Sequence, residues 1–181
     1  MPYAVGPVLI SSEQIQQRVY EMAAQIDADY PHGPLYLVSV LKGAFMFVAD
    51  LARALKWCAV RIEFMAISSY GSEKTSSGQV KVTRDLDVNI EGHNVLIVED
   101  IIDSGVTLSY LTRILEQRRP KSLEIATLLD KPERRVQPVR VKYVGFRIPD
   151  EFVVGYGLDY AEDYRNLSDI CVLTTQPQAR P

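Results

Sequence analysis

The sequence has few cysteines, no excess of basic charge and no long apolar run, and each absence argues against a class of protein. Only Cys58 and Cys171 are present, so a disulfide framework is not expected and a reducing, cytoplasmic setting is favoured. The net charge is −3, from 20 Lys and Arg against 23 Asp and Glu, so no overall basic field favours nucleic acid. No stretch approaches the ~18 apolar residues of a membrane span. The N-terminus also lacks the basic start and apolar core of a signal peptide.

The length and composition fit a single globular domain. A chain of 181 residues with 47% hydrophobic composition is long and apolar enough to bury a good core. No internal repeat or low-complexity segment divides it. We therefore expect one soluble, cytoplasmic domain that binds neither membranes nor nucleic acid, and any anionic substrate must meet local donors instead of a basic surface.

The most informative stretch runs from Asn94 to Leu108 and reads N-V-L-I-V-E-D-I-I-D-S-G-V-T-L. Its apolar, mostly β-branched start predicts a strand over 95–98 that is buried on both faces and ends at the acidic pair. An acidic, glycine-containing turn follows, and helical periodicity resumes at Leu108 with Ser104 or Thr107 as the expected N-cap. A buried strand, such a turn and a helix start are where α/β sheets place ligand sites.

Acidic and anion-binding features lie side by side in this stretch. Glu99, Asp100 and Asp103 place three carboxylates within five positions. Two such charges about 5 Å apart repel by roughly 3 kcal/mol at an effective dielectric constant of about 20, so water or a cation is needed beside them. The backbone N–H groups after Gly105 are free to hold an anion. The stretch predicts a phosphate ligand that arrives with Mg²⁺, although a solvated acidic turn that caps a helix remains an alternative.

The rest of the chain alternates between strand and helix patterns. Ser11 and Gln14 form a capping-box pattern at the start of a helix that ends by 31–34. Apolar runs and helical spacings then predict, in chain order, a strand over 35–40, a helix over 44–56, strands over 60–67, 79–83 and 87–90, the strand and helix of the central stretch, a helix end near 120, and strands over 122–129, 141–146 and 169–174.

Four other segments each allow two interpretations from their residues alone. Lys42-Gly43 after a strand offers a cation and N–H donors to a phosphate, or is a plain connection. The serine-rich segment 68–78 is either a lid or a hairpin tip. Lys131 lies in a charged turn after a strand, where lysines are usually solvated, and Phe152 fits a core position.

The central stretch resembles the phosphoribosyl pyrophosphate motif of the type I phosphoribosyltransferases. Its form E-D-I-I-D-S-G resembles the 6-oxopurine branch, the hypoxanthine-guanine phosphoribosyltransferases, and five motifs in the expected order cover 35–173. The resemblance implies an α/β domain with a mainly parallel central sheet, helices on both of its faces, and a small hood from both termini. We expect a core over about 35–147, and a hood from about 1–34 and 148–181.

The resemblance also implies an activity, a cofactor and an assembly state. The 5-phosphoribosyl group would pass from phosphoribosyl pyrophosphate to N9 of hypoxanthine or guanine, which gives IMP or GMP and pyrophosphate in purine salvage, with Mg²⁺ as cofactor. The resemblance also implies a homodimer or homotetramer. A regulator on the same fold that senses phosphoribosyl pyrophosphate and binds nucleic acid is the alternative, but it would need a basic face. The pairs Arg118-Arg119 and Arg134-Arg135 are too short for one.

Residue roles carry over position by position from the matching motifs. Asp103 is the implied general base or acid at the purine N7. Lys131, in L-D-K-P, donates to the purine O6. In F-V-V-G-Y-G-L-D-Y, Phe152 stacks on the base, which is worth ~1–3 kcal/mol, and the Val153 backbone reads the base edge. The metal residues are Glu99, Asp100 and Asp159.

The residues that the resemblance assigns to binding phosphoribosyl pyrophosphate come from five segments. The L-K-G tripeptide binds pyrophosphate, with Leu41 before a bond that is often a non-proline cis peptide in the family, and the serine-tyrosine pair of S-S-Y-G closes over the reaction centre. One position departs from some relatives: Val106 stands where they carry a lysine, which removes a possible phosphate contact but leaves the backbone cradle. The implied ligands are Lys42, Gly43, Ser69, Tyr70, Glu99, Asp100, Ser104, Gly105, Val106, Thr107 and Arg165.

Overall fold

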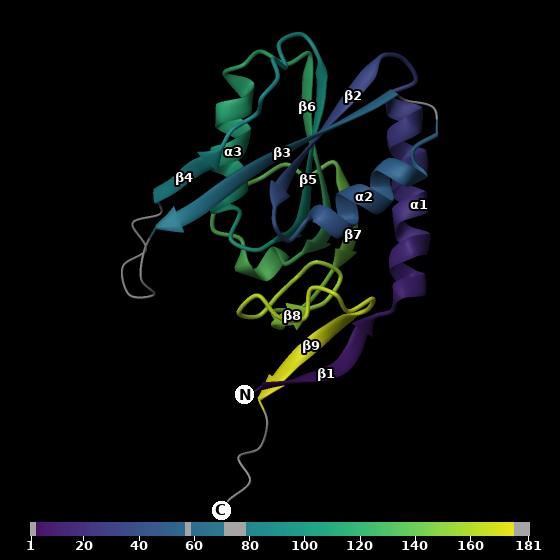
Figure 1. Ribbon diagram of the computed structural model, residues 1–181, viewed down its shortest axis with the longest axis vertical. Helices are drawn as coiled ribbons and strands as arrows, with labels where there is room; N and C mark the ends of the chain where they lie inside the picture. Colours follow the sequence, from purple (N-terminus) through teal and green to yellow (C-terminus); the bar gives the residue numbers. More distant parts are fainter. Residues whose placement is uncertain (1–2, 57–58, 71–78, 176–181) are drawn as a thin grey trace, which may run out of the picture.

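The computed structural model describes residues 3–56, 59–70 and 79–175 of the chain, in which two β-sheets and three α-helices are present (Figure 1). The expected loop over 71–78 lies outside these residues. The elements, in chain order, are β1 (Tyr3–Ile10), α1 (Ser12–Asp29), β2 (Pro34–Leu41), α2 (Phe45–Ala54), β3 (Ala59–Tyr70), β4 (Gln79–Arg84), β5 (Asn94–Ile102), α3 (Val106–Glu116), β6 (Ser122–Asp130), the short 3₁₀ helix η1 (Pro132–Arg134), β7 (Tyr143–Arg147), β8 (Val153–Val154) and β9 (Ile170–Thr175).

The larger sheet has the strand order β4-β3-β2-β5-β6-β7, in which the five strands from β3 to β7 are parallel to one another and β4 pairs antiparallel with β3. The chain builds outward from β2 through β3 and β4, then returns to β5 and builds outward in the other direction. The order therefore reverses between β2 and β5, and ligands of such sheets bind at the carboxyl ends of the strands at this point. The mainly parallel sheet that we predicted is confirmed.

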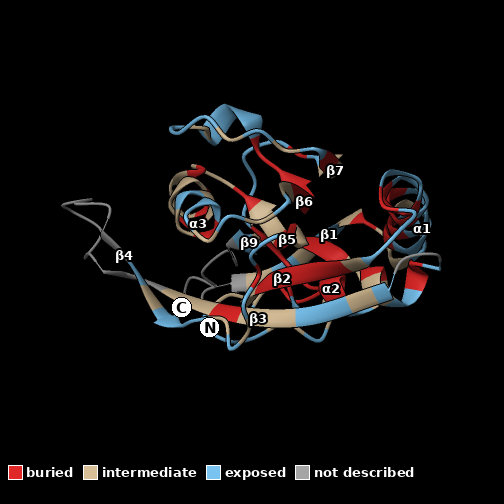
Figure 2. Cartoon of the chain, turned by 90° about the horizontal axis from the view of Figure 1, so that it is seen from above, coloured by how far each residue is buried: buried red, intermediate tan, exposed pale blue. Residues whose placement is uncertain are grey.

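Helices cover both faces of this sheet, as the buried strands require. Alternate residues of β2 face opposite sides: Leu35 and Leu37 pack with α1 and α2, whereas Tyr36 and Val38 pack with α3. The two layers of helices lie on opposite sides of the sheet in Figure 1. Figure 2 shows the consequence, since β2 is buried along most of its length while β3, nearer the edge, is partly exposed.

Helix α1 begins where its residues predict. Ser11 Oγ accepts a hydrogen bond from the Gln14 backbone N–H, and the Gln14 side chain accepts one from the Ser11 N–H, so the capping box is complete. The buried residues Ile15, Val19 and Met22 follow at helical spacing. Cap and apolar face both orient α1 onto the sheet.

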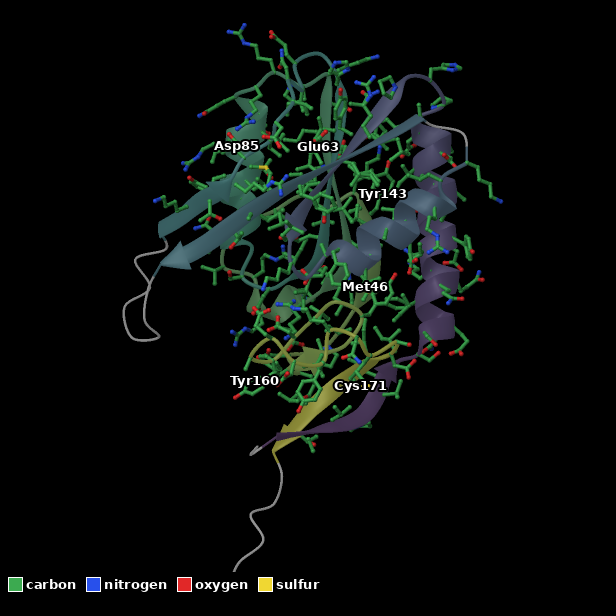
Figure 3. The ribbon with its side chains drawn as sticks, in the orientation of Figure 1. Met46, Glu63, Asp85, Tyr143, Tyr160 and Cys171 are labelled. Carbon is green, nitrogen blue, oxygen red and sulfur yellow. The ribbon has the colours of Figure 1, made fainter. Side chains whose placement is uncertain are left out.

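The smaller sheet is a hood with the order β1-β9-β8, antiparallel throughout, at the carboxyl end of the larger sheet (Figure 1). It joins the two ends of the chain, as the predicted hood requires. Cys171 lies in β9 of this sheet, Tyr160 lies in the segment between β8 and β9, and Met46 faces the hood from the start of α2 (Figure 3). Buried hood residues such as Val153 and Ile170 share one hydrophobic cluster with α1, α2 and the larger sheet.

Several predicted boundaries were wrong. Strand β5 does not end at Glu99 but continues to Ile102, because its pairing with β6 extends that far. Helix α3 begins at Val106, and its N-cap is Gly105 with φ of +80°, in place of Ser104 or Thr107. Other differences concern strands: β3 runs through 68–70, which we assigned to the loop, residues 87–90 form no strand, and β1 and β8 were not predicted.

Gly157 of the hood packs against the loop after β2, and substitution of this glycine should be costly. Gly157 has φ of +100°, and a Cβ there would lie 2.1 Å from the Gly43 carbonyl oxygen. Gly157→Ala should therefore lower the free energy of unfolding by more than the roughly 1–3 kcal/mol that a strained backbone costs alone. Gly92→Ala is the control, because Gly92 also has positive φ but has nothing within 4 Å of the position that a Cβ would take. Urea unfolding of both variants measures the difference, and equal losses would show that the contact does not matter.

Candidate functional site

The predicted site residues gather at one edge of the larger sheet. Their strands are neighbours in the order β3-β2-β5-β6, and the parallel strands all end at this edge. Ser69 and Tyr70 are the last residues of β3, and Lys42 follows β2. Asp103 follows β5 and Lys131 follows β6. Positions that are up to 89 residues apart in the chain (131 − 42) thus meet on adjoining strand ends.

The loop between β5 and α3 forms a small cavity beside the first turn of α3. The cavity measures about 150 Å³ and is lined by Glu99, Ile101, Ile102, Asp103, Ser104, Gly105, Thr107 and Leu108. The Ser104 carbonyl oxygen accepts hydrogen bonds from the backbone N–H groups of Val136 and Gln137, at 2.9 and 3.0 Å. A neighbouring loop therefore holds this turn in place, and the first turn of α3 can receive an anion.

Glu99, which is buried, and Asp100, which is partly buried, lie side by side near the end of β5. Burial raises the pKa of Glu99 well above its usual range, and the neighbouring Asp100 raises it further. Burial is also the largest cause that raises the pKa of Asp100, to about 6, although the backbone N–H of Ile101 and the charge of Arg165 oppose it. The carboxylate of Asp100 packs on the backbone of Gly43, where a Cβ would overlap it. This pair is costly to ionise without a cation beside it.

Lys42 and Arg165, the two cationic side chains that the resemblance assigns to pyrophosphate, pair with acidic residues of the hood. Lys42 Nζ lies 2.8 Å from Glu162 Oε2, and the peptide bond before Lys42 is cis, as the family resemblance implies. Arg165 contacts Asp159 at 2.8 Å and Glu162 at 3.5 Å. Its other terminal nitrogen donates to the Gly157 carbonyl oxygen at 2.7 Å. The two cations are therefore close together, with one carboxylate between them.

The implied purine residues lie directly after β6 and in and beside β8 of the hood. The side chain of Lys131 is only 9% exposed, so it is not the solvated lysine of the alternative interpretation. Phe152 is 54% exposed, which excludes the core position, and its ring meets the Tyr160 ring edge to face. Val153 is buried in β8, so its side chain faces the core and only its backbone is available to a ligand.

Three charged residues near these groups were missed in the sequence. Arg134 Nε donates to Asp103 Oδ1 at 3.0 Å, and Arg134 NH1 donates to Asp150 Oδ2 at 3.4 Å. Asp150 Oδ1 lies 3.8 Å from Lys131 Nζ. Glu162 bridges the two pyrophosphate cations. The only sequence signal was that each of the three lies within a few residues of a matched motif.

The acidic residues fit a site for Mg²⁺ in which the substrate supplies further ligands. In the described residues, no three His, Cys, Asp or Glu side chains cluster tightly enough to hold a metal alone. Mg²⁺ usually takes one or two carboxylates together with water and substrate phosphates. Asp159 lies close enough to raise the pKa of Asp100, so these carboxylates face a common region.

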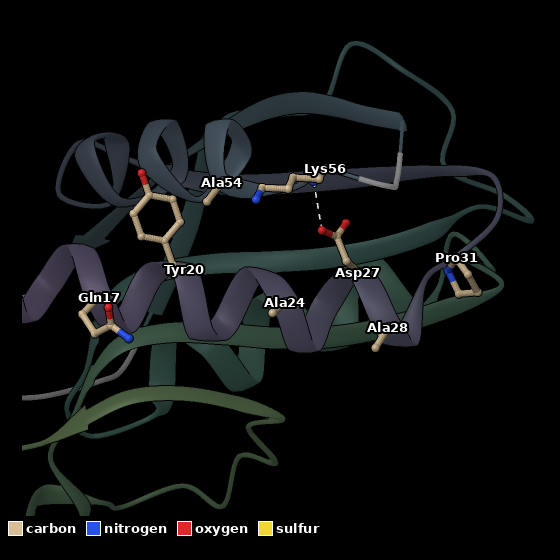
Figure 4. A pocket seen from close by; sticks show the side chains of 8 residues that line it. All are labelled: Gln17, Tyr20, Ala24, Asp27, Ala28, Pro31, Ala54 and Lys56. Atoms are coloured by element: carbon tan, nitrogen blue, oxygen red, sulfur yellow. Dashed lines mark hydrogen bonds between the residues drawn. The ribbon is translucent and has the colours of Figure 1, made fainter.

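A larger hollow elsewhere contains none of these residues. It measures about 870 Å³ and lies between α1 and the end of α2, where Asp27 Oδ2 accepts a hydrogen bond from the Lys56 N–H (Figure 4). Its lining consists of Gln17, Tyr20, Ala24, Asp27, Ala28, Pro31, Ala54 and Lys56.

None of the helices in the described ranges has the length and apolar composition to cross a membrane.

Comparison with known proteins gives concordant matches. The family model for the phosphoribosyl transferase domain matches residues 11–161. The chain is 49% identical over 173 residues to a hypoxanthine-guanine phosphoribosyltransferase of Bacillus subtilis, with 96% of each chain covered. It is 52% identical over 178 residues to the protein of the same name from Mycobacterium tuberculosis, which covers 95% of this chain and 88% of that one. The crystal structure of a hypoxanthine-guanine phosphoribosyltransferase from Bacillus anthracis superposes with a TM-score of 0.89 at 48% identity, over 96% of this chain and 99% of that one.

Proposed function

The chain belongs to the hypoxanthine-guanine phosphoribosyltransferases of the type I phosphoribosyltransferase family, and from that membership we propose how its residues divide the work of the reaction. Enzymes of this family act in purine salvage. They transfer the 5-phosphoribosyl group of phosphoribosyl pyrophosphate to a 6-oxopurine and release pyrophosphate. The observation that carries our assignment is that one sheet edge brings Asp103 and Lys131 together with the Glu99–Asp100 pair, whose pKa values are raised.

We assign the phosphoribosyl pyrophosphate to the strand ends from β3 to β5 and to the hood. The 5′-phosphate takes the cavity at the start of α3, where it meets the N–H groups and hydroxyls of 104–107. The pyrophosphate takes Lys42, Gly43 and Arg165, whose guanidinium suits a phosphate. It must displace Glu162 from both side chains, because Glu162 pairs with Lys42 and with Arg165. Ser69 and Tyr70 at the end of β3 close over the reaction centre.

We assign the purine to the space beside Lys131, Phe152 and Val153. The Lys131 ammonium donates to O6, and its near-complete burial supports this role because a buried donor needs an acceptor. The exposed ring of Phe152 stacks on the base, and the backbone of Val153 reads its edge. A backbone contact of this kind suits both hypoxanthine and guanine.

The chemical step is a displacement at C1′ of the ribose. N9 of the purine forms a bond to C1′ while the bond from C1′ to the pyrophosphate oxygen breaks, and the pyrophosphate keeps that electron pair. The transition state resembles an oxocarbenium ion, by analogy with glycoside cleavage. Asp103 takes the proton from N7, so the purine ring remains neutral in the product. Holding the two substrates in line supplies up to about 7–11 kcal/mol of the barrier reduction.

Glu99, Asp100 and Asp159 are the residues that would hold Mg²⁺. When bound, Mg²⁺ neutralises charge on the pyrophosphate as it leaves. Glu99 and Asp100 also accept hydrogen bonds from the ribose hydroxyls. Their raised pKa values support a cation site, because a cation would offset the cost of ionising both carboxylates in a buried position.

Proton release tests this assignment. The pKa of Asp100 is raised to about 6, and that of Glu99 is also raised, so part of the pair is protonated near pH 6 in the free protein. Binding of Mg²⁺ requires the ionised form and should therefore release protons at pH 6 and few at pH 8. Titration calorimetry with Mg²⁺ and phosphoribosyl pyrophosphate, in buffers of different ionisation enthalpy, measures this release.

The matched variant is Asp100→Asn, which cannot release its proton. The ligand's own phosphates also titrate, so the difference between wild type and variant isolates the protein's contribution. Equal proton release from both proteins at pH 6 would remove Asp100 from the metal site.

Two further proposals concern the whole molecule. We propose that the chain acts as a single domain in the cytoplasm, since its two cysteines suit a reducing setting. We also propose a homodimer or homotetramer, which sedimentation of the purified protein distinguishes from a monomer.

A further inference from the structure

A chain of alternating charges runs from Asp103 to Lys131. Arg134 donates to Asp103 at 3.0 Å and to Asp150 at 3.4 Å, and Asp150 lies 3.8 Å from the Lys131 ammonium. The sequence of charges is therefore acid, base, acid, base. Its two ends are the residues to which we assign proton transfer and recognition of O6.

These four residues come from three separate segments. Asp103 follows β5, Lys131 and Arg134 flank and end η1 after β6, and Asp150 lies between β7 and β8. A single guanidinium thus joins the loop that holds the 5′-phosphate to the loops that face the purine. An arginine suits this task, because its planar, rigid fork directs two hydrogen bonds at once.

The exposure of the pairs indicates that they are not there for stability. The side chains of Arg134, Asp103 and Asp150 are 54%, 45% and 47% exposed. Ion pairs at this exposure contribute little to folding. What the contact does provide is direction: a half-exposed carboxylate is free to rotate, and a hydrogen bond to one of its oxygens selects one orientation. The Asp103 hydrogen bond also raises the pKa of Arg134, so the guanidinium remains charged.

We propose that Arg134 is a positioning residue for the transfer reaction. It orients the Asp103 carboxylate toward the purine N7, and through Asp150 it ties that orientation to the placement of Lys131. Recognition of the 6-oxo group and acceptance of the N7 proton are then parts of one connected network. The proposal rests on the role assigned to Asp103.

The first test is the split between kcat and KM in Arg134→Gln. Misplacing a reacting group by about 1 Å can cost about 100-fold in rate, so we expect kcat to fall by about 10- to 100-fold. The KM for phosphoribosyl pyrophosphate should stay within about twofold, because its phosphates contact other residues. Arg134→Lys keeps the charge and one donor, and it should recover part of kcat. Arg84→Gln is the matched control: its pair with Asp87 is also exposed but lies on the edge strand β4, and it should change nothing.

The second test repeats Arg134→Gln in an Asp103→Asn background. If Arg134 acts through Asp103, the second substitution should lower kcat by less than about twofold further. A full additional loss would overturn the proposal, because Arg134 would then act independently. A kcat of Arg134→Gln at or above wild type would also overturn it, since the contact would then be dispensable or would restrain Asp103.

The same set of variants separates this proposal from the function on which it rests. If Asp103→Asn loses rate and Arg134→Gln does not, only the role of Arg134 fails. If Asp103→Asn itself reacts at the wild-type rate, the proton-transfer role of Asp103 fails, and the role of Arg134 fails with it.

Discussion

Asp103→Asn should lower kcat by about 10²–10⁴-fold and leave the KM for phosphoribosyl pyrophosphate nearly unchanged, because positioned proton transfer is typically worth that factor. Asparagine keeps the size of the side chain and a hydrogen-bonding group but cannot accept the N7 proton. The phosphate cavity should persist, because the backbone hydrogen bonds from Val136 and Gln137 to Ser104 do not involve the Asp103 side chain. Single-turnover kinetics with saturating substrates measures the chemical step directly.

Glu99→Gln provides the contrast for this prediction. Glu99 lies inside β5 and is buried beside Asp100, whereas Asp103 lies in the loop that follows the strand. Its substitution should raise the KM for phosphoribosyl pyrophosphate and the Mg²⁺ concentration needed for half-maximal rate.

A near wild-type kcat for Asp103→Asn would mean that Asp103 only orients the purine and that water carries the proton.

Lys131 should account for the rejection of adenine, which is the second large effect. Hypoxanthine presents an acceptor at position 6, whereas adenine presents a donor there and would leave the Lys131 ammonium facing another donor. Sites built to hydrogen-bond one such group reject the mismatched analogue by about 10⁴–10⁵-fold. We expect the wild-type enzyme to prefer hypoxanthine by about this factor in kcat/KM.

Lys131→Gln should reduce the preference for hypoxanthine over adenine by changing kcat/KM for both bases. The glutamine amide can donate to O6 or accept from the adenine amino group, so kcat/KM should fall for hypoxanthine and rise for adenine. Lys142→Gln is the matched control, because Lys142 also pairs with an aspartate, Asp29 at 2.9 Å, but outside the site. Equal use of adenine and hypoxanthine by the wild type would end this assignment.

Local sequence signals were sufficient for most of the elements. The capping box at Ser11 and Gln14 defines the start of α1, and continuous apolar runs identify β2 and β6, because a strand buried on both faces has little choice of residue. The alternation of these patterns predicts a parallel sheet. The motif that runs from β5 into α3 was long enough to indicate both the family and the sheet edge at which the ligand binds.

Pairing between distant segments explains what the sequence did not predict. Glu99 and Asp100 look like turn residues, yet Glu99 pairs with Thr127 of β6 and the strand continues past both of them. Strand β1 contains Gly6 and Pro7, which weaken any local strand signal, and it forms only because β9 pairs with it. The charged network has the same origin, because it joins residues whose proximity depends on how three loops pack.

The hood also determines the order in which the site can be built. Residues 3–10 pair with 170–175, so this sheet closes only when the first and last parts of the chain meet. Contacts of such long sequence separation must first overcome the entropy of closing the intervening chain. The loops after β2 and β5 face no such delay once the core sheet has formed. During synthesis, β1 therefore leaves the ribosome well before its partner β9, and the parts of the site that Phe152, Val153 and Arg165 contribute are completed after the cavity at the start of α3.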